Sequence, residues 1–128
     1  HRNYKADIQS ISAILKQKKL ERVQLNTRAG YFFVNPDDII FIKADGNYSH
    51  IMLPNDKIEI ITQSVGSLED TLEHGTFFRI SRSYIINMQY ISKVDRKKNI
   101  IDLECNDNKY SIKIPGSKLR ILEKFFKN

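Results

Sequence analysis

The chain of 128 residues lacks several features that mark secreted and membrane proteins. Cys105 is its only cysteine, so an internal disulfide is excluded and a reducing cytoplasm is the expected compartment. No apolar run is long enough to span a bilayer, and no signal peptide opens the sequence. The first residue is His1 and not methionine, and we therefore expect the chain to be a piece of a longer protein.

The sequence also lacks the patterns of catalysis and metal binding. It has no nucleophile with a nearby base, no cluster of cysteines and histidines, and no glycine loop that would cradle a phosphate. His50 is far in sequence from His1 and His74, which favours a half-exposed strand histidine over a metal ligand. We therefore expect no enzymatic activity and no metal or cofactor.

Positive charge is concentrated in the C-terminal part of the chain. Residues 79–128 hold 12 Lys and Arg against 5 Asp and Glu, whereas residues 1–78 hold 9 against 10. The whole excess behind the net charge of +6 therefore lies beyond residue 78. Segregated positive charge favours a polyanionic partner, although a solvated surface that keeps the domain soluble explains a charge bias equally well.

The apolar residues, 41% of the chain, suffice for the core of one domain and not of two. Residues 6–20 predict a helix, because Ile8, Ile11 and Leu15 repeat at intervals of three and four. We interpret residues 1–20 as a linker helix at the end of a connector to an upstream domain, and residues 21–128 as the globular domain. Pairing of this helix with another chain stays an alternative.

From residue 21 onward, short runs of β-branched and aromatic residues alternate with turn residues. This texture predicts a mostly β fold, an elongated antiparallel sheet or sandwich of about ten short strands. Two helices interrupt it: a short one near 64–73, capped by Ser64, and a C-terminal one whose Phe125 and Phe126 face inward. The clearest strand candidates are residues 23–27, 31–34, 39–44, 48–53, 57–61, 90–94, 99–104 and 109–114.

The most informative stretch is FFRISRSYIIN at residues 77–87. Its phenylalanines and isoleucines can anchor a loop in a core while Arg79, Ser81, Arg82 and Ser83 project from it. Arginine offers a rigid fork that matches phosphate oxygens or the edge of a guanine, and small hydroxyls fit close to a DNA backbone. The stretch predicts a contact surface for nucleic acid, held by a hydrophobic frame.

The two arginines of this stretch differ in the partners that the sequence offers them. No acidic residue lies between residues 77 and 94 to occupy Arg82, which favours a functional role. Arg79 has a structural alternative, an ion pair with Glu69 or Asp70. Asn87 favours a structural role, in which its amide closes a turn after Ile86.

Three motifs follow one another in the order of a known family. They are FIKADGNY at residues 41–48, FRISRSYIIN at 78–87 and IPGSK at 114–118, with a short helix containing Leu68 between the first two. Together they resemble the LytTR family of bacterial DNA-binding domains, over roughly residues 21–126.

The resemblance implies an elongated, mostly β domain that reads double-stranded DNA from loops instead of a recognition helix. Members are typically output domains of two-component response regulators of the LytR/AlgR type, joined to a receiver domain that accepts phosphate on an aspartate. We therefore expect a cytoplasmic transcription regulator whose upstream receiver domain is absent from this chain. Its partners would be paired promoter sites, bound by a dimer or by two copies.

The resemblance also implies the residues that contact DNA. Base contacts would come from Ser49, Arg82 and Lys118. Lys118 stands where many members carry arginine, so a base contact and a phosphate contact are both compatible with it. The neighbours that would contact phosphates or support the loops are Asn47, His50, Arg79, Ser81, Ser83 and Ser117.

Two other functions stay open on the sequence alone. The basic face and the N-terminal helix are compatible with an interaction module that binds an acidic protein partner. Exposed aromatic residues would suit a small β domain that binds RNA or single-stranded nucleic acid by stacking. Binding to duplex promoter fragments, compared with RNA and random duplex, separates these functions.

Overall fold

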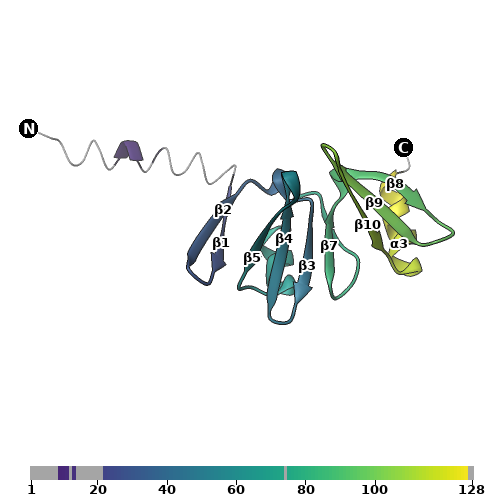
Figure 1. Cartoon of the computed structure of the whole chain (residues 1–128), viewed down its shortest axis with the longest axis horizontal. Coiled ribbons are helices and arrows are strands. Elements are labelled where there is room, and N and C mark those ends of the chain that lie inside the picture. The colour runs from purple at the N-terminus through teal and green to yellow at the C-terminus, as the bar shows by residue number, and fades with distance from the viewer. Residues whose placement is uncertain (1–8, 12, 14–21, 74, 127–128) are drawn as a thin grey trace, which may run out of the picture.

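The computed structural model describes residues 9–11, 13, 22–73 and 75–126, in which ten strands form three antiparallel sheets (Figure 1). A two-stranded sheet pairs β1 with β2, a five-stranded sheet has the order β5-β4-β3-β7-β6, and a three-stranded sheet has the order β10-β9-β8. The predicted mostly β, antiparallel fold is confirmed. The strands are β1 (Val23–Thr27), β2 (Gly30–Val34), β3 (Phe41–Asp45), β4 (Tyr48–Leu53), β5 (Lys57–Ile61), β6 (Phe77–Arg79), β7 (Tyr84–Asn87), β8 (Ile91–Asp95), β9 (Ile100–Cys105) and β10 (Asn108–Lys113).

Short helices connect and cover these sheets. The α-helix α2 (Val65–Thr71) begins at the predicted cap, because the Ser64 hydroxyl accepts a hydrogen bond of 3.1 Å from the Ser67 amide. The second α-helix, α3 (Gly116–Glu123), follows β10. No helix among the described residues is long and apolar enough to cross a membrane. The 3-10 turns are η1 (Pro36–Asp38), η2 (Pro54–Asp56), η3 (Met88–Tyr90) and η4 (Lys124–Phe126).

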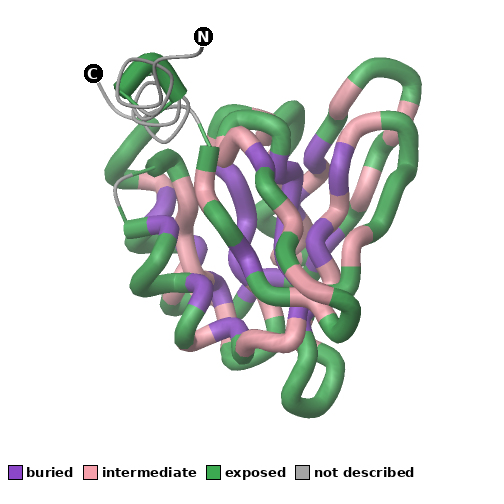
Figure 2. Tube along the Cα trace, turned by 90° about the vertical axis from the view of Figure 1, so that its left-hand side faces the viewer, coloured by how far each residue is buried: buried purple, intermediate pink, exposed green. Residues whose placement is uncertain are grey.

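The central strands of the five-stranded sheet carry buried residues on both faces, and this divides the apolar residues into two clusters. Neighbouring residues of a strand point to opposite faces, so Ile42 and Ile85 pack with α2 and the two-stranded sheet. Phe41 and Ile86 pack instead with the three-stranded sheet and α3. The expected single core is therefore two clusters that share one sheet. Figure 2 shows the buried segments within the sheets and the exposed ones at the turns.

Three sequence predictions differ from the structure or fall partly outside it. The stretch 77–87, expected to be a loop in an apolar frame, contains two further strands, β6 and β7. Phe125 and Phe126 are exposed, not turned inward, although the Phe125 ring contacts that of Phe78 edge-on. Of the predicted helix 6–20, residues 9–11 and 13 are helical, Ile11 is exposed, and the rest lies outside the described residues.

Asn87 is a buried polar residue that ties β7 to its surroundings. Its side-chain amide donates a hydrogen bond of 2.9 Å to the Ile39 carbonyl, and its side-chain oxygen accepts from the Gln89 amide and the Thr76 hydroxyl. A buried side-chain amide without hydrogen-bond partners would destabilise the fold, so each of these bonds contributes to the stability of the domain. The prediction that Asn87 closes a turn is confirmed, because it caps η3.

Tyr110 joins the three-stranded sheet to the central one. Its ring contacts Phe41 edge-on, with 5.2 Å between centroids, and its hydroxyl donates a hydrogen bond of 2.9 Å to the Asp56 carboxylate. Burial, followed by the hydrogen bond to Asp56, raises the pKa of Tyr110 to about 12. The neutral phenol is thus the form that the folded domain favours.

We predict that this link is lost at high pH. Because the pKa of Tyr110 is raised above its ordinary value of 10.0, its contribution to stability is complete below pH 10 and falls as pH rises toward about 12. Urea unfolding of the wild type and of Tyr110→Phe should therefore differ by a constant amount below pH 10 and converge above it. Phenolate absorbance gives an independent measurement: if every tyrosine ionises near pH 10, the assignment is wrong.

Candidate nucleic-acid interface

The loop between β6 and β7 is held to the central sheet by its backbone. The Ile80 side chain is fully buried, and its amide donates a hydrogen bond of 3.1 Å to the Tyr84 carbonyl. At the other end of the loop, the Ser83 carbonyl accepts a hydrogen bond of 2.7 Å from the Ala44 amide on β3. The residues between these anchors, Ser81 and Arg82, are thereby presented at the end of β3.

Arg79 holds the backbone of this loop through hydrogen bonds from its guanidinium. Its Nε donates to the Ser81 carbonyl at 3.0 Å, and its Nη2 donates to the Arg82 carbonyl at 3.3 Å. Its Nη1 pairs with Glu69 Oε1 of α2 at 3.1 Å. The structural alternative for Arg79, a pair with Glu69, is confirmed. One planar guanidinium joins the helix to two carbonyls of the loop, a geometry that a lysine cannot reproduce.

The Ser81 hydroxyl is also occupied within the loop. It accepts a hydrogen bond of 3.2 Å from the Ser83 amide, which tightens the turn around Arg82. The Ser83 side chain is exposed. Ser81 therefore supports the loop, and Ser83 remains on the surface.

Arg82 is exposed, and its guanidinium has no hydrogen bond or ion pair with any described residue. It lines a shallow depression of about 530 Å³ together with Arg79, Ser81 and Lys118. The depression brings together two of the three predicted motifs, the stretch 77–87 and the start of α3. Two cationic side chains distant in sequence thus flank one surface.

Lys118 is positioned by the first turn of α3. Pro115 precedes the helix, and Leu119 and Leu122 are buried in the core shared with the central sheet, so the start of α3 cannot shift freely. Ser117 is exposed beside Lys118. Gly116 has an ordinary helical backbone, and a Cβ there would meet only the Arg120 side chain, at 3.8 Å. Nothing in the local backbone requires glycine at this place.

The third motif forms the tight turn between β3 and β4. Asp45 and Tyr48 are paired across the strands, and Gly46 takes the left-handed backbone that such a turn requires, with φ of 60°. Asn47 is exposed at the tip. The His50 Nε2 lies 3.0 Å from Asp45 Oδ2, so His50 braces the turn from β4.

Ser49 does not lie on this surface. Its side chain is fully buried, and its hydroxyl donates a hydrogen bond of 2.7 Å to the Gln63 carbonyl. In this conformation the expected base contact from Ser49 is blocked by burial, which is a correction to the sequence analysis. The residue instead ties β4 to the segment before α2.

The three motifs meet at one end of the domain. Lys43 of β3 pairs with Tyr84 of β7, and the bond between Ala44 and Ser83 brings the β3–β4 turn beside the β6–β7 loop. Figure 1 shows this turn, this loop and the start of α3 at the lower end of the molecule. Residues separated by long stretches of sequence thus form one exposed surface.

The electrostatics of this end favour an anion. The Glu69 carboxylate pairs with Arg79 at 3.1 Å, and the Asp45 carboxylate contacts His50 at 3.0 Å, so both already have partners within the domain. Among the described residues, no carboxylate pairs with Arg82 or Lys118. Two unpaired cations on an exposed surface suit phosphate or the acceptor edge of a base.

The comparisons agree with the geometry. The LytTr DNA-binding domain family matches residues 29–127, most of the chain. The chain belongs to the LytTR family. No curated protein matches it. A solved structure described as the LytTr DNA-binding domain of a methyl-accepting/DNA response regulator from Bacillus cereus superposes with a TM-score of 0.66 and 19% identity, covering 84% of this chain and 98% of that one. At that identity the likeness establishes the fold, and the family match establishes a DNA-binding domain.

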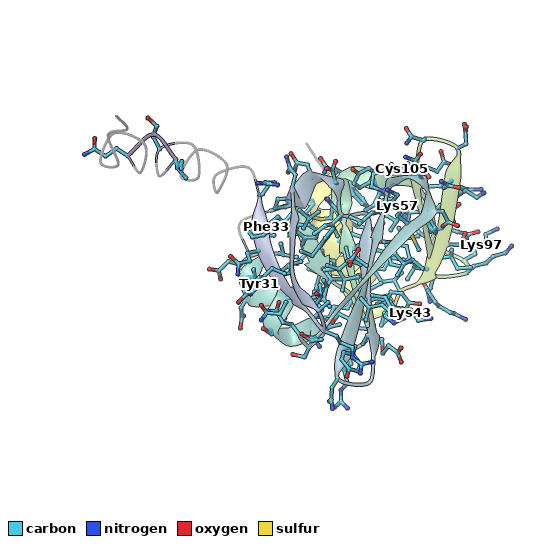
Figure 3. All side chains as sticks on the ribbon, turned by 60° about the vertical axis from the view of Figure 1, so that its left-hand side comes forward. Tyr31, Phe33, Lys43, Lys57, Lys97 and Cys105 are labelled. Carbon is cyan, nitrogen blue, oxygen red and sulfur yellow. The ribbon has the colours of Figure 1, made fainter. Side chains whose placement is uncertain are left out.

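Lys43 is a surface residue that the sequence analysis did not single out. It is exposed on β3, between the partners Tyr84 and His50 in the register of the sheet. Alternation places Lys43 on the same face of β3 as Phe41, and its exposure shows that the second apolar cluster does not cover this end of the strand, so its charge was the only signal in the sequence (Figure 3). Lys43 adds a third cation beside the β6–β7 loop that carries Arg82.

We predict that Arg79 positions the loop. Arg79→Ala removes three hydrogen bonds, two of them to loop carbonyls, and should lower the free energy of unfolding by about 1–3 kcal/mol. Arg79→Lys should recover little of it, because one ammonium cannot reach both carbonyls and Glu69. Urea unfolding measures the loss.

Arg28→Ala is the matched control, since Arg28 is an exposed arginine at the β1–β2 turn. It should change stability by less than about 0.5 kcal/mol. Equal stability of the Arg79 and Arg28 variants would show that the three bonds contribute nothing to the loop.

Proposed function

We propose that this LytTR domain binds double-stranded DNA in a sequence-specific manner and reads the major groove from its loops. The observation that carries the proposal is the exposed, unpaired Arg82 guanidinium on a loop whose shape is fixed by other residues. A bidentate contact from arginine to guanine needs a free guanidinium, and a fixed backbone reduces the ordering that binding requires. The loop fixes the backbone of Arg82 and leaves its guanidinium free.

The proposed roles follow from the contacts. Arg82 reads a base, and Lys118, a single point charge without a fork, contacts a phosphate. Asn47, Ser83 and Ser117 are exposed beside them and suit phosphate oxygens. The four supporting residues hold the turn and the loop: Arg79, Ser81, Ser49 and His50.

The wider setting is also part of the proposal. We infer that the domain is the output half of a bacterial two-component regulator, placed in the cytoplasm and controlled by a receiver domain upstream. A small surface with few base-reading side chains discriminates weakly between DNA sequences. Two linked copies on paired repeats would bind more tightly than one, because the second copy binds at a high local concentration. Deformation of the DNA between the loops would add specificity.

Duplex DNA is favoured over a single strand by the position of the aromatic residues. The strongly exposed Tyr31 and Phe33 lie on β2, in a different sheet from the Arg82 loop. A binder of single strands needs aromatic faces along its cationic groove. Near the proposed interface Tyr48 is exposed, whereas Phe78 is half-buried and the ring of the exposed Phe125 packs edge-on against it, so few aromatic faces are free for stacking.

Arg82→Ala should reduce binding to the specific site more than binding to random duplex. Loss of a bidentate contact to guanine costs about 1–3 kcal/mol and relaxes the preference at that base, whereas loss of a phosphate contact weakens all sequences alike. Fluorescence anisotropy at one salt concentration, with a selected site and a random duplex, measures both effects.

Circular dichroism provides the check that the fold is intact, and Arg28→Ala provides a charge-matched control far from the loop. Equal losses on both duplexes would reassign Arg82 to the DNA backbone. Unchanged affinity for both would remove the β6–β7 loop from the interface.

Lys118→Gln should lower the affinity for all duplexes and flatten its dependence on salt. Each neutralised phosphate contributes about −0.9 to the slope of log affinity against log salt concentration, so the slope should become shallower by about that amount. Titrations at several salt concentrations give the two slopes. A slope that stays the same while one base preference changes would instead make Lys118 a base-reading residue.

A further inference from the structure

Positive charge gathers at a turn outside the proposed DNA surface. The β8–β9 turn joins Asp95 to Ile100, and residues 93–98 hold four basic side chains against one carboxylate. Like charges so close in sequence repel one another, and an anionic partner would relieve this repulsion. The basic residues are Lys93, Arg96, Lys97 and Lys98, and all four are exposed.

The backbone of this turn is fixed from within. The Asp95 carboxylate accepts hydrogen bonds of 3.0 Å from the amides of both Lys97 and Lys98. Asn99 takes a left-handed backbone with φ of 53°, which asparagine adopts more readily than most residues. The turn therefore presents its two lysines from a defined backbone, and the Asp95 carboxylate is occupied by amides of the same turn.

The arginine of the turn differs from the two lysines in its partners. The Arg96 Nη2 lies 2.7 Å from Glu123 Oε2 of α3, in an ion pair that fastens the turn to the helix. Neither Lys97 nor Lys98 pairs with a carboxylate in the part of the chain that the structure describes. Lys97 points away from the body of the domain in Figure 3. The two lysines are therefore available to bind an anion.

A hydrogen bond places this turn next to the start of α3. The Ile114 amide donates a bond of 2.9 Å to the Asn99 carbonyl, two residues before α3 begins. Lys113, the residue before Ile114, is exposed beside the turn. Figure 1 shows the turn at the right of the molecule, beyond the start of α3 as seen from the β6–β7 loop. Basic residues thus continue sideways from the depression that Arg82 and Lys118 line.

We propose that the β8–β9 turn is a second DNA contact, in which Lys97 and Lys98 bind backbone phosphates beside the stretch that Arg82 reads. The inference rests on the proposed binding of duplex DNA, and it adds a contact that carries no sequence information. Lysine suits this role, because its ammonium is a point charge on a flexible stem. The turn lies higher in Figure 1 than the β3–β4 turn, so the flanking DNA would curve toward the domain to reach it.

Salt titrations of the full chain on two lengths of duplex test the proposal. One duplex extends about ten base pairs beyond the selected site on each side, and the other is trimmed to the site itself. On the extended duplex, Lys97→Gln combined with Lys98→Gln should lower the affinity and make the slope of log affinity against log salt concentration shallower by about 1.8, or about 0.9 for each lost phosphate contact. On the trimmed duplex the variant and the wild type should have the same slope. The preference for the selected site over a random duplex of equal length should stay the same.

A matched control separates a local contact from general charge. Lys57→Gln combined with Lys109→Gln removes two exposed lysines, one at the start of β5 and one at the end of the β9–β10 pair opposite the turn, and should leave both slopes as in the wild type. Circular dichroism shows whether each variant is folded. An equal loss in this control, or a loss that persists on the trimmed duplex, would overturn the proposal.

An unchanged slope on the extended duplex would also overturn it. In that case Arg82→Ala would still reduce the preference for the selected site if the proposed function holds. A wild-type chain that binds neither duplex would remove the proposed function together with this contact.

Discussion

The antiparallel pairing of β3 with β7 is the constraint on which the rest of the domain depends. It places Ile42 beside Ile85 on one face and Phe41 beside Ile86 on the other, so that both apolar clusters contain residues of these two strands. The same pairing continues into the bond between Ala44 and Ser83, which sets the β6–β7 loop next to the β3–β4 turn. The packing of the core and the position of the proposed DNA surface therefore depend on the same strand pair.

Local signals explain how much of the fold could be predicted from the sequence. Turn residues mark the ends of most strands in the sequence. The Ser64 cap was sufficient to predict α2, and the motif at 41–48 was sufficient to predict the β3–β4 turn. The strands β6 and β7 were missed because residues 77–87 contain the adjacent apolar pairs Phe77-Phe78 and Ile85-Ile86, without the alternation that marks a half-buried strand. Membership of the LytTR family was predictable because its three motifs occur in order.

The site was predictable only where a residue's partners are near in sequence. Arg79 and Arg82 were recognised as different because the nearby acidic residues lie on the side of Arg79. Ser49 was misplaced because its burial depends on the Gln63 carbonyl, fourteen positions away and across a strand pair. The exposure of Phe125 and Phe126 depends in the same way on where α3 ends against the sheet, which periodicity alone does not set.

The bonds that shape the β6–β7 loop end on backbone atoms and on the side chains of Arg79 and Ser81, and none of them uses the side chain at position 82. The identity of that side chain is therefore uncoupled from the stability of the scaffold. A relative with glutamine, asparagine or histidine at this place would keep the same loop while offering DNA a different set of donors and acceptors. Substitution at position 82 could therefore change the DNA sequence that such a domain prefers while the loop and the fold stay the same.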